Sequence, residues 1–315
     1  MWLQIYNEGE EFMWFIFSLL TALSWGAADL FYKKGSDSHD KYSHLKIITM
    51  VGLVMGIHGT SYMLINGIHF DPFDMVRYLP VSALYILSMT IGYIGLRYIE
   101  LSIASPVQNS SGAVTAILLF IFFPQDLGFV DIAGIAIITL GVVSLAILEK
   151  RAEVEALKLN KVEIDPKYQI SILAITFPIL YCIIDGLGTF ADGIYLDELK
   201  LISEDAALLA YEFTFFICAV ITFIYLKGIK KVKDFNIFKE RDKGFAAILE
   251  TTGQFFYVFA MAKNAIIAAP LVASYSIFSV ILSRIFLKEK LSSKHYAVII
   301  IVMFGIILLG IADEL

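Results

Sequence analysis

Charged residues, cysteines and histidines are all scarce in this sequence. Charged side chains account for 17% of its 315 residues, whereas a soluble domain has about 25%. The two cysteines give no disulfide framework, and the five histidines form no H-E-x-x-H zinc motif. A net charge of −6 without a long basic stripe argues against nucleic acid as a partner. Since 58% of the chain is apolar and its mean hydropathy is +0.76, the composition instead predicts a polytopic membrane protein.

Sequence motifs of nucleotide-using and hydrolytic enzymes are missing as well. There is no G-x-x-x-x-G-K-[ST] loop to bind phosphates and no G-x-S-x-G elbow to present a nucleophile. We therefore expect no enzymatic activity, no cofactor and no metal. Acidic residues do gather in one segment, which we expect to be a solvated acidic face: Asp192, Asp197, Glu198, Glu204 and Asp205.

Ten apolar stretches are long enough to cross a membrane as helices. A bilayer core of about 30 Å requires roughly 20 apolar residues in helical form, and lipid offers the backbone no other hydrogen-bond partners. The sequence therefore predicts an all-α membrane protein with ten transmembrane helices. The predicted spans are 12–32, 46–66, 79–98, 101–123, 130–148, 169–191, 205–227, 244–263, 265–287 and 294–312.

Lysine and arginine residues are concentrated in alternate loops between these spans. Of the 24 basic residues, only Arg77, Lys200 and Lys263 fall on the side that also holds the termini. Basic loops resist translocation and remain in the cytoplasm. The charge pattern therefore predicts a protein of the cell membrane with both termini outside the cytoplasm.

The second half of the chain repeats the first. A shift of 164 positions places residues 101–128 on 265–292 without a gap and aligns nine identical residues, among them Pro106 with Pro270. Composition alone predicts roughly three such matches. The two halves therefore share one structural plan.

An odd number of helices in each half reverses the orientation of the second half. A shift of 156 positions pairs Asp29 with Asp185, and we expect repeats at 1–148 and 169–315 joined by a charged linker at 149–168. Inverted repeats are typical of secondary transporters, in which the substrate site lies between the halves. The two aspartates are then expected on opposite sides of the membrane midplane.

Ionisable side chains within the spans are candidates for proton coupling or gating. A charge in lipid costs at least about 2.5–3.5 kcal/mol on insertion scales, so each such residue needs a specific reason. Carboxyl groups in apolar surroundings and histidine both exchange protons near neutral pH, as proton coupling requires. Hydrogen bonding between packed helices is the alternative role for each of them. The candidates are Asp29, His58, Asp185, Glu212 and Glu250.

Aromatic and amide side chains within the spans are candidates for substrate contacts. Gln254 and Tyr257 follow Glu250 at i+4 and i+7 and share its helix face. Trp25 and Tyr181 each lie four residues before one of the paired aspartates. An aromatic-lined cavity suits organic cations or ring-bearing solutes. The predicted substrate-binding residues are Trp25, Tyr93, Gln108, Tyr181, Gln254, Tyr257 and Tyr275.

Several short stretches resemble the drug/metabolite transporter superfamily in its ten-helix EamA-type form. They are Leu23-Ser-Trp-Gly-Ala-Ala-Asp29, Ile103-Ala-Ser-Pro106, Ala268-Ala-Pro-Leu-Val-Ala-Ser274 and Ile285-Phe-Leu-Lys-Glu-Lys-Leu291. The resemblance implies a helical bundle with a central cavity that moves small metabolites. It also implies a glutamate after the fourth helix to match Glu289, where this chain has Gln125, and termini in the cytoplasm, contrary to the charge pattern.

Together, the repeat and the resemblance predict a secondary active transporter. It would export or exchange a small organic metabolite by alternating access, driven by protons or by the solute gradient, as a monomer or homodimer in the bilayer. One alternative is a flippase for a lipid-linked carrier, which needs a cavity open towards lipid. The other is a non-transporting membrane scaffold, in which the polar residues are sealed in helix contacts.

Overall fold

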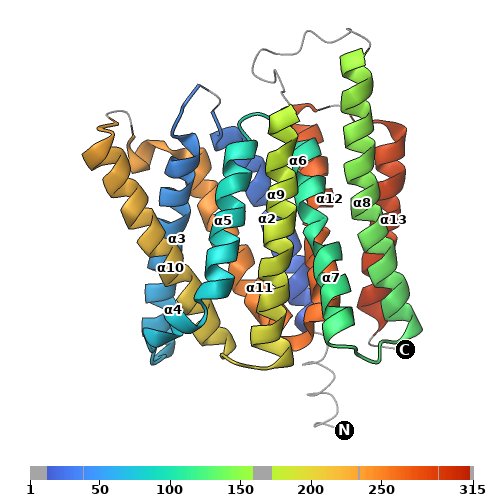
Figure 1. The fold of residues 1–315 in the computed structure, drawn as a ribbon, viewed down its shortest axis with the longest axis horizontal. Helices are drawn as coiled ribbons and strands as arrows, with labels where there is room; N and C mark the ends of the chain where they lie inside the picture. The colour runs from blue at the N-terminus through green and yellow to red at the C-terminus, as the bar shows by residue number, and fades with distance from the viewer. Residues whose placement is uncertain (1–12, 38, 159–171, 233–234, 290, 313–315) are drawn as a thin grey trace.

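The computed structural model describes residues 13–37, 39–158, 172–232, 235–289 and 291–312, and these ranges contain helices and no strand. Figure 1 shows the long helices standing side by side. The α-helices are α2 (Met13–Gly35), α3 (Ser43–Asn66), α4 (Phe73–Arg77), α5 (Leu79–Gly95), α6 (Leu101–Asn109), α7 (Ser111–Phe122), α8 (Phe129–Lys158), α9 (Ile172–Gly193), α10 (Glu204–Ile224), α11 (Arg241–Ala273), α12 (Tyr275–Leu282) and α13 (Ser293–Ala312). Short helical turns are η2 (Ile194–Glu198), η3 (Tyr225–Ile229), η4 (Ile237–Lys239) and η5 (Ser283–Leu287).

The described residues cross the bundle ten times. Seven stretches are each long and apolar enough to span a membrane, and α5 and α13 add shorter apolar helices. The longest stretch, Arg241–Leu287, makes two crossings because its backbone leaves the helical region at Asn264 (φ −162°, ψ 83°). Helix α2 begins at the face where α13 ends (Figure 1). The predicted all-α architecture of ten helices in two repeats is confirmed.

Helix α8 extends further than its apolar span. The sequence predicts a linker over 149–168, but α8 continues to Lys158. Its last turns consist mostly of Glu, Lys, Ala and Leu, which are strong helix formers, so the helix persists beyond the apolar region. The rest of the predicted linker, 159–168, lies outside the described residues, as do the ends of the predicted repeats at 1–12, 169–171 and 313–315.

The main helix pairs each join the first half of the chain to the second. Helix α2 packs on α11 and α5 packs on α9, which are equivalent pairings in the two repeats. Helix α3 packs on α10 and α8 packs on α13, and each of these pairs joins two equivalent helices. The pattern of contacts therefore has the two-fold relation expected of inverted repeats.

Two crossings are interrupted at equivalent residues. Ser110 separates α6 from α7, and Ser274 separates α11 from α12, with nearly equal backbone angles (φ −61°, ψ −9° and φ −65°, ψ −6°). Each serine lies four residues after a proline, Pro106 in one half and Pro270 in the other. Each serine hydroxyl also donates to a carbonyl of the preceding turn, at 3.0 and 2.6 Å, in competition with the helix's own bonds. The sequence repeat thus reappears as a repeated break in the backbone.

Candidate functional site

A cavity lies between the two repeats and is lined by residues from both. Its volume, measured for the centres of water molecules, is about 70 Å³. A water needs about 10–15 Å³ by this measure, so the cavity has room for several waters or one small solute. Ten of the twelve predicted site residues line it: Trp25, Asp29, Tyr93, Gln108, Tyr181, Asp185, Glu250, Gln254, Tyr257 and Tyr275. His58 and Glu212 do not.

Asp29 and Asp185, the paired aspartates, face this cavity at different depths. Asp29 Oδ2 accepts hydrogen bonds from the hydroxyls of Ser105 and Ser279, each at 2.7 Å. Asp185 Oδ2 accepts one from Ser111 at 2.8 Å. Ser105 and Ser111 belong to one crossing and are six residues apart, which corresponds to about 9 Å along a helix axis. The two carboxyl groups are therefore separated along the bundle but open to one space.

Glu250 is the third carboxyl group of the cavity. Its Oε2 accepts a hydrogen bond from the Tyr32 hydroxyl at 3.3 Å, and its backbone carbonyl accepts one from Trp25 Nε1 at 3.2 Å. Gln254 and Tyr257 also line the cavity, in agreement with their spacing from Glu250. Among the described residues, no group of three or more His, Cys, Asp or Glu side chains is arranged to hold a metal ion.

Aromatic rings form much of the cavity wall. The centroid of the Trp25 ring lies 5.0 Å from that of Tyr257 and 5.8 Å from that of Tyr275. The rings of Tyr32 and Tyr93 lie 4.7 Å apart on another part of the wall. Ring pairs at these distances stabilise one another, so they hold the shape of the cavity.

His58 and Glu212 contact each other outside the cavity. His58 Nδ1 lies 2.7 Å from Glu212 Oε1, and Glu212 is fully buried where α10 packs on α3. The sequence places both residues near the middle of a predicted span, as it does the cavity carboxylates. Position along a span does not determine which neighbouring helix a side chain contacts. Their part in proton coupling or gating stays a prediction.

Asp192 is a buried carboxylate close to the cavity wall. The solvated acidic face predicted for it is wrong: Asp192 is fully buried and accepts hydrogen bonds from the hydroxyls of Tyr78 and, at 3.5 Å, Tyr85. Helix α9 still continues at this point, so Asp185, Thr189 and Asp192 share one face at i, i+4 and i+7. Tyr85 and Thr189 both line the cavity. The i, i+4, i+7 spacing from Asp185 is therefore the sequence signal that could have placed Asp192 on the cavity side of α9.

A carboxylate caps the start of α6. The two oxygens of Glu289 accept hydrogen bonds from the backbone N–H groups of Leu101 and Ser102, at 3.2 and 3.0 Å. These N–H groups have no partner within the helix, and the helix dipole favours negative charge there. Glu289, at the end of one interrupted crossing, thus fixes the start of the other.

The equivalent cap in the other repeat comes from a different residue. Gln125, at the position equivalent to Glu289, donates to Glu198 Oε1 at 2.8 Å. Asp197 Oδ2 instead accepts from the backbone N–H of Ala265 at 2.8 Å, directly after the kink at Asn264. Asp197 and Glu198 are both half-buried, so each makes a contact between segments while part of its side chain stays exposed.

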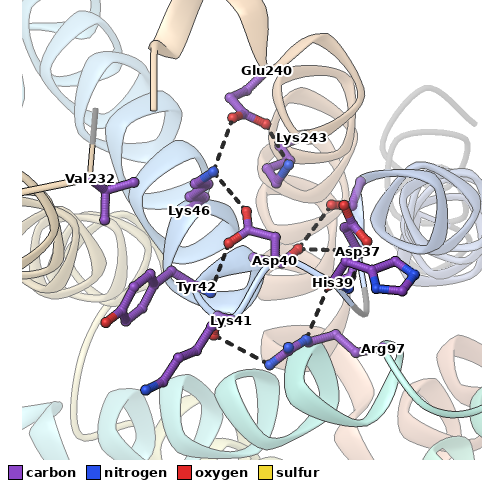
Figure 2. Close-up of polar contacts among 12 residues, drawn as sticks. Asp37, His39, Asp40, Lys41, Tyr42, Lys46, Arg97, Val232, Glu240 and Lys243 are labelled. Atoms are coloured by element: carbon purple, nitrogen blue, oxygen red, sulfur yellow. Dashed lines mark hydrogen bonds and ion pairs between the residues drawn. The ribbon is translucent and has the colours of Figure 1, made fainter. Parts of the chain in front are cut away.

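Charged side chains connect several segments at the face where α3 and α11 begin (Figure 2). Lys46 Nζ lies 2.7 Å from Asp40 and 3.8 Å from Glu240, and Glu240 also pairs with Lys243. We name these four residues the entrance network. They join the loop after α2, the start of α3 and the start of α11.

Arg97 and Lys33 hold the backbone around the entrance network. Arg97 donates to the carbonyls of Asp37 and Lys41 at 3.2 and 3.4 Å (Figure 2). Lys33 Nζ donates to the carbonyl of Leu96, a cavity-lining residue, at 2.9 Å. The loop after α2 is thereby tied to the end of α5, over one end of the cavity.

Asp40 remains charged over the physiological pH range. Burial acts to raise its pKa, but hydrogen bonds from Lys46 and from the backbone N–H of Tyr42, with the nearby positive charge, bring the pKa below its ordinary value. A carboxyl group with a lowered pKa contributes stability above its ordinary pKa of about 3.9 and loses that contribution as the pH falls through the lowered value. The entrance network therefore persists at neutral and mildly acidic pH.

Comparisons with known proteins agree with this arrangement. A family model described as the EamA-like transporter family matches residues 12–147 and 172–311. One solved structure, described only as the crystal structure of a protein, matches with a TM-score of 0.62 at 11% sequence identity, covering 94% of this chain and 96% of that one. At this identity the likeness shows the fold alone. The comparison with curated proteins gives no significant match.

Proposed function

Because the chain belongs to the EamA-like transporter family, we propose that it is a secondary active transporter that carries a small organic solute by alternating access. The observation that carries this proposal is the central cavity, which both repeats line and into which Asp29 and Asp185 project from equivalent helices. Inverted repeats exchange conformations about their common axis, and the exchange opens a central site first to one side and then to the other.

Different contacts cover the two ends of the cavity. The entrance network and the bond from Lys33 to Leu96 lie at the end where α3 and α11 begin. Asp192, with Tyr78 at the start of α5, lies towards the opposite end. Two separate sets of contacts break one at a time, as alternating access requires.

Proton coupling is assigned to the carboxyl groups of the cavity. Asp29, Asp185 and Glu250 share one small space, so protons and a solute compete for the same groups. The protein then acts as an exporter or an exchanger in the cell membrane. We assign His58 and Glu212 to gating, because their contact joins α3 to α10 and neither residue lines the cavity.

Cysteine accessibility tests alternating access without knowledge of the solute. In a variant lacking Cys182 and Cys218, a single cysteine replaces either Leu96 or Thr189, which line the cavity towards its two ends. We expect a membrane-impermeant maleimide to label Leu96→Cys only from the face of the entrance network. Thr189→Cys is expected to react only from the opposite face. In a non-transporting scaffold neither cysteine would be labelled from either face. In a static pore each cysteine would be labelled from both faces.

Weakening the contacts at one end of the cavity should change the labelling of the two cysteines in opposite directions, which is a more demanding test of alternating access. Asp40→Asn removes the charge that Lys46 pairs with, and an ion pair of this kind is worth roughly 0.2–1 kcal/mol, or up to about fivefold in population. Labelling of Leu96→Cys should rise and that of Thr189→Cys should fall, so that the ratio of the two labelling rates changes by up to about fivefold. Asp242→Asn, an exposed change on the same face outside the network, is the control. A parallel rise at both cysteines contradicts alternating access.

Orientation is tested with a topology reporter. The distribution of basic residues leads us to expect an extracytoplasmic signal from a reporter fused after Leu315, because 21 of the 24 basic residues lie on the other side. A fusion after Lys231, in one of the basic loops, should give the opposite signal. Cytoplasmic activity at the C-terminus together with extracytoplasmic activity after Lys231 reverses the predicted orientation.

A further inference from the structure

The side chains that line the cavity supply negative charge without positive charge to balance it. Asp29, Asp185 and Glu250 face the space, and no Lys, Arg or His is among the described residues that line it. The amine of Lys33 is directed at two carbonyls of the 96–99 segment, at 2.9 and 2.5 Å. Buried charges are stable only when paired. The cavity carboxylates therefore require either protons or a cation that enters from outside.

Two carboxylate oxygens are free to receive such a cation. Both oxygens of Asp185 accept hydrogen bonds from serines, Ser88 at 3.2 Å and Ser111 at 2.8 Å. By contrast, the bonds to Asp29 all reach Oδ2, and the one to the Glu250 carboxylate reaches Oε2. Within the described part of the chain, Asp29 Oδ1 and Glu250 Oε1 have no donor. These acceptors belong to residues on the wall of the cavity.

Aromatic faces surround the same space. Trp25 is fixed by its bond to the Glu250 carbonyl and packs against Tyr257 and Tyr275, and all four residues line the cavity. The face of an aromatic ring attracts a cation, most strongly when the cation is shielded from water. Negative carboxylates and electron-rich ring faces thus recognise the same sign of charge.

We propose that the solute carried through this cavity is a small organic cation, an amine or ammonium compound that bears no carboxylate or phosphate. The inference rests on the proposed transport function and specifies its substrate class. A singly charged cation displaces one proton, from either Asp29 or Glu250, so the net charge of the cavity is the same before and after the exchange. A zwitterion or anion would bring its negative group against three carboxyl groups, and the lining residues in the described ranges include no basic side chain.

Binding of matched probes to the purified full-length protein tests the substrate class. The probes are choline and ethanolamine as cations, 3,3-dimethyl-1-butanol as the neutral isostere of choline, and glycine betaine as a zwitterion. Calorimetry should show binding of at least one cation, at least about tenfold tighter than either the isostere or betaine, because hydrogen bonds and contacts to charged groups carry the recognition. The proposal is overturned when neither cation binds, or when the isostere or betaine binds as tightly.

Variants connect the binding to the named residues. Asp29→Asn and Glu250→Gln should each weaken cation binding by about tenfold or more. Asp205→Asn, a carboxylate outside the cavity, should leave it unchanged. Tyr275→Leu should weaken binding severalfold while Tyr275→Phe keeps it, since phenylalanine retains the ring face. The two Tyr275 variants keep all the carboxylates, so they still test whether the cavity binds the cation when the acidic variants do not fold. Unchanged affinity in every folded variant overturns the proposal.

Counterflow in proteoliposomes separates this inference from the proposed function. Vesicles preloaded with unlabelled choline and diluted into labelled choline should accumulate label only when the protein is present. Cation binding without counterflow supports the site and counts against transport. Reciprocal cysteine labelling, as described above, without binding of either cation supports transport and overturns the organic-cation assignment.

Discussion

A single methyl group at residue 52 is expected to destabilise the bundle strongly. Helix α3 packs so closely on α10 at Gly52 that a Cβ there would lie 2.3 Å from the backbone oxygen of Phe215 and 2.6 Å from Ala219 Cβ. A backbone oxygen in a helix has no room to yield, so the two helices must separate. Such overpacking costs about 1–3 kcal/mol and sometimes more. Gly52→Ala should therefore lower the melting temperature and the yield of monodisperse protein.

Gly228→Ala is the matched control for this prediction. Gly228 is also helical, but a Cβ there would have its nearest neighbour, Ile224 Cγ2, at 3.9 Å, an ordinary contact. The same glycine-to-alanine change should therefore leave stability unchanged or slightly raised. Equal melting temperatures for Gly52→Ala and the parent protein would show that the α3–α10 contact is looser than described.

Removal of the Asp192 carboxylate is the second change with a large expected effect. In Asp192→Ala the buried Tyr78 hydroxyl loses its acceptor, and an unsatisfied buried polar group costs about 1–3 kcal/mol. We expect a lower melting temperature. We also expect more maleimide labelling of Thr189→Cys from its own face, because the contact that covers this end of the cavity is lost. Asp192→Asn keeps an acceptor and should show a smaller change in both measurements.

A second tyrosine–aspartate pair provides the control for Asp192. Tyr62 donates to Asp205 at 2.8 Å, but these side chains are only half-buried, so water replaces a lost partner. Asp205→Ala should therefore change the melting temperature little. If Asp205→Ala destabilises the protein as much as Asp192→Ala does, burial is not the reason for the effect.

The helices and their repeat follow from the sequence because each depends on local properties. Span length is set by the bilayer, and ten apolar runs of that length appear as ten crossings. Ser110 and Ser274 each donate a hydroxyl hydrogen bond to a carbonyl of their own preceding turn, which depends on local sequence alone, so the breaks at these serines recur in both halves. Cavity residues with helical spacing from a carboxylate, such as Gln254, are found in the same way.

Contacts between distant segments are what the sequence does not reveal. His58 and Glu212 have the right depth for a cavity, but α3 turns them towards α10. Asp192 has acidic neighbours in sequence, which suggests solvent, yet its position two turns after Asp185 makes it buried. Gln125 breaks the expected symmetry, and only the structure shows that Asp197 supplies the missing cap. In each case the decisive partner lies on another helix.

The pairing of helices across the two repeats has a consequence for biogenesis. Helices α2, α3, α5 and α8 each pack mainly on a helix of the second half, so the first five crossings have few partners of their own when they leave the ribosome. Until α12 is made, the Asp29 carboxyl group lacks the hydrogen bond from Ser279 and has the one from Ser105, which comes from its own half. The first half is thus inserted with helix faces that its own helices do not cover, and the number of residues between α8 and α9 sets how soon its partners follow.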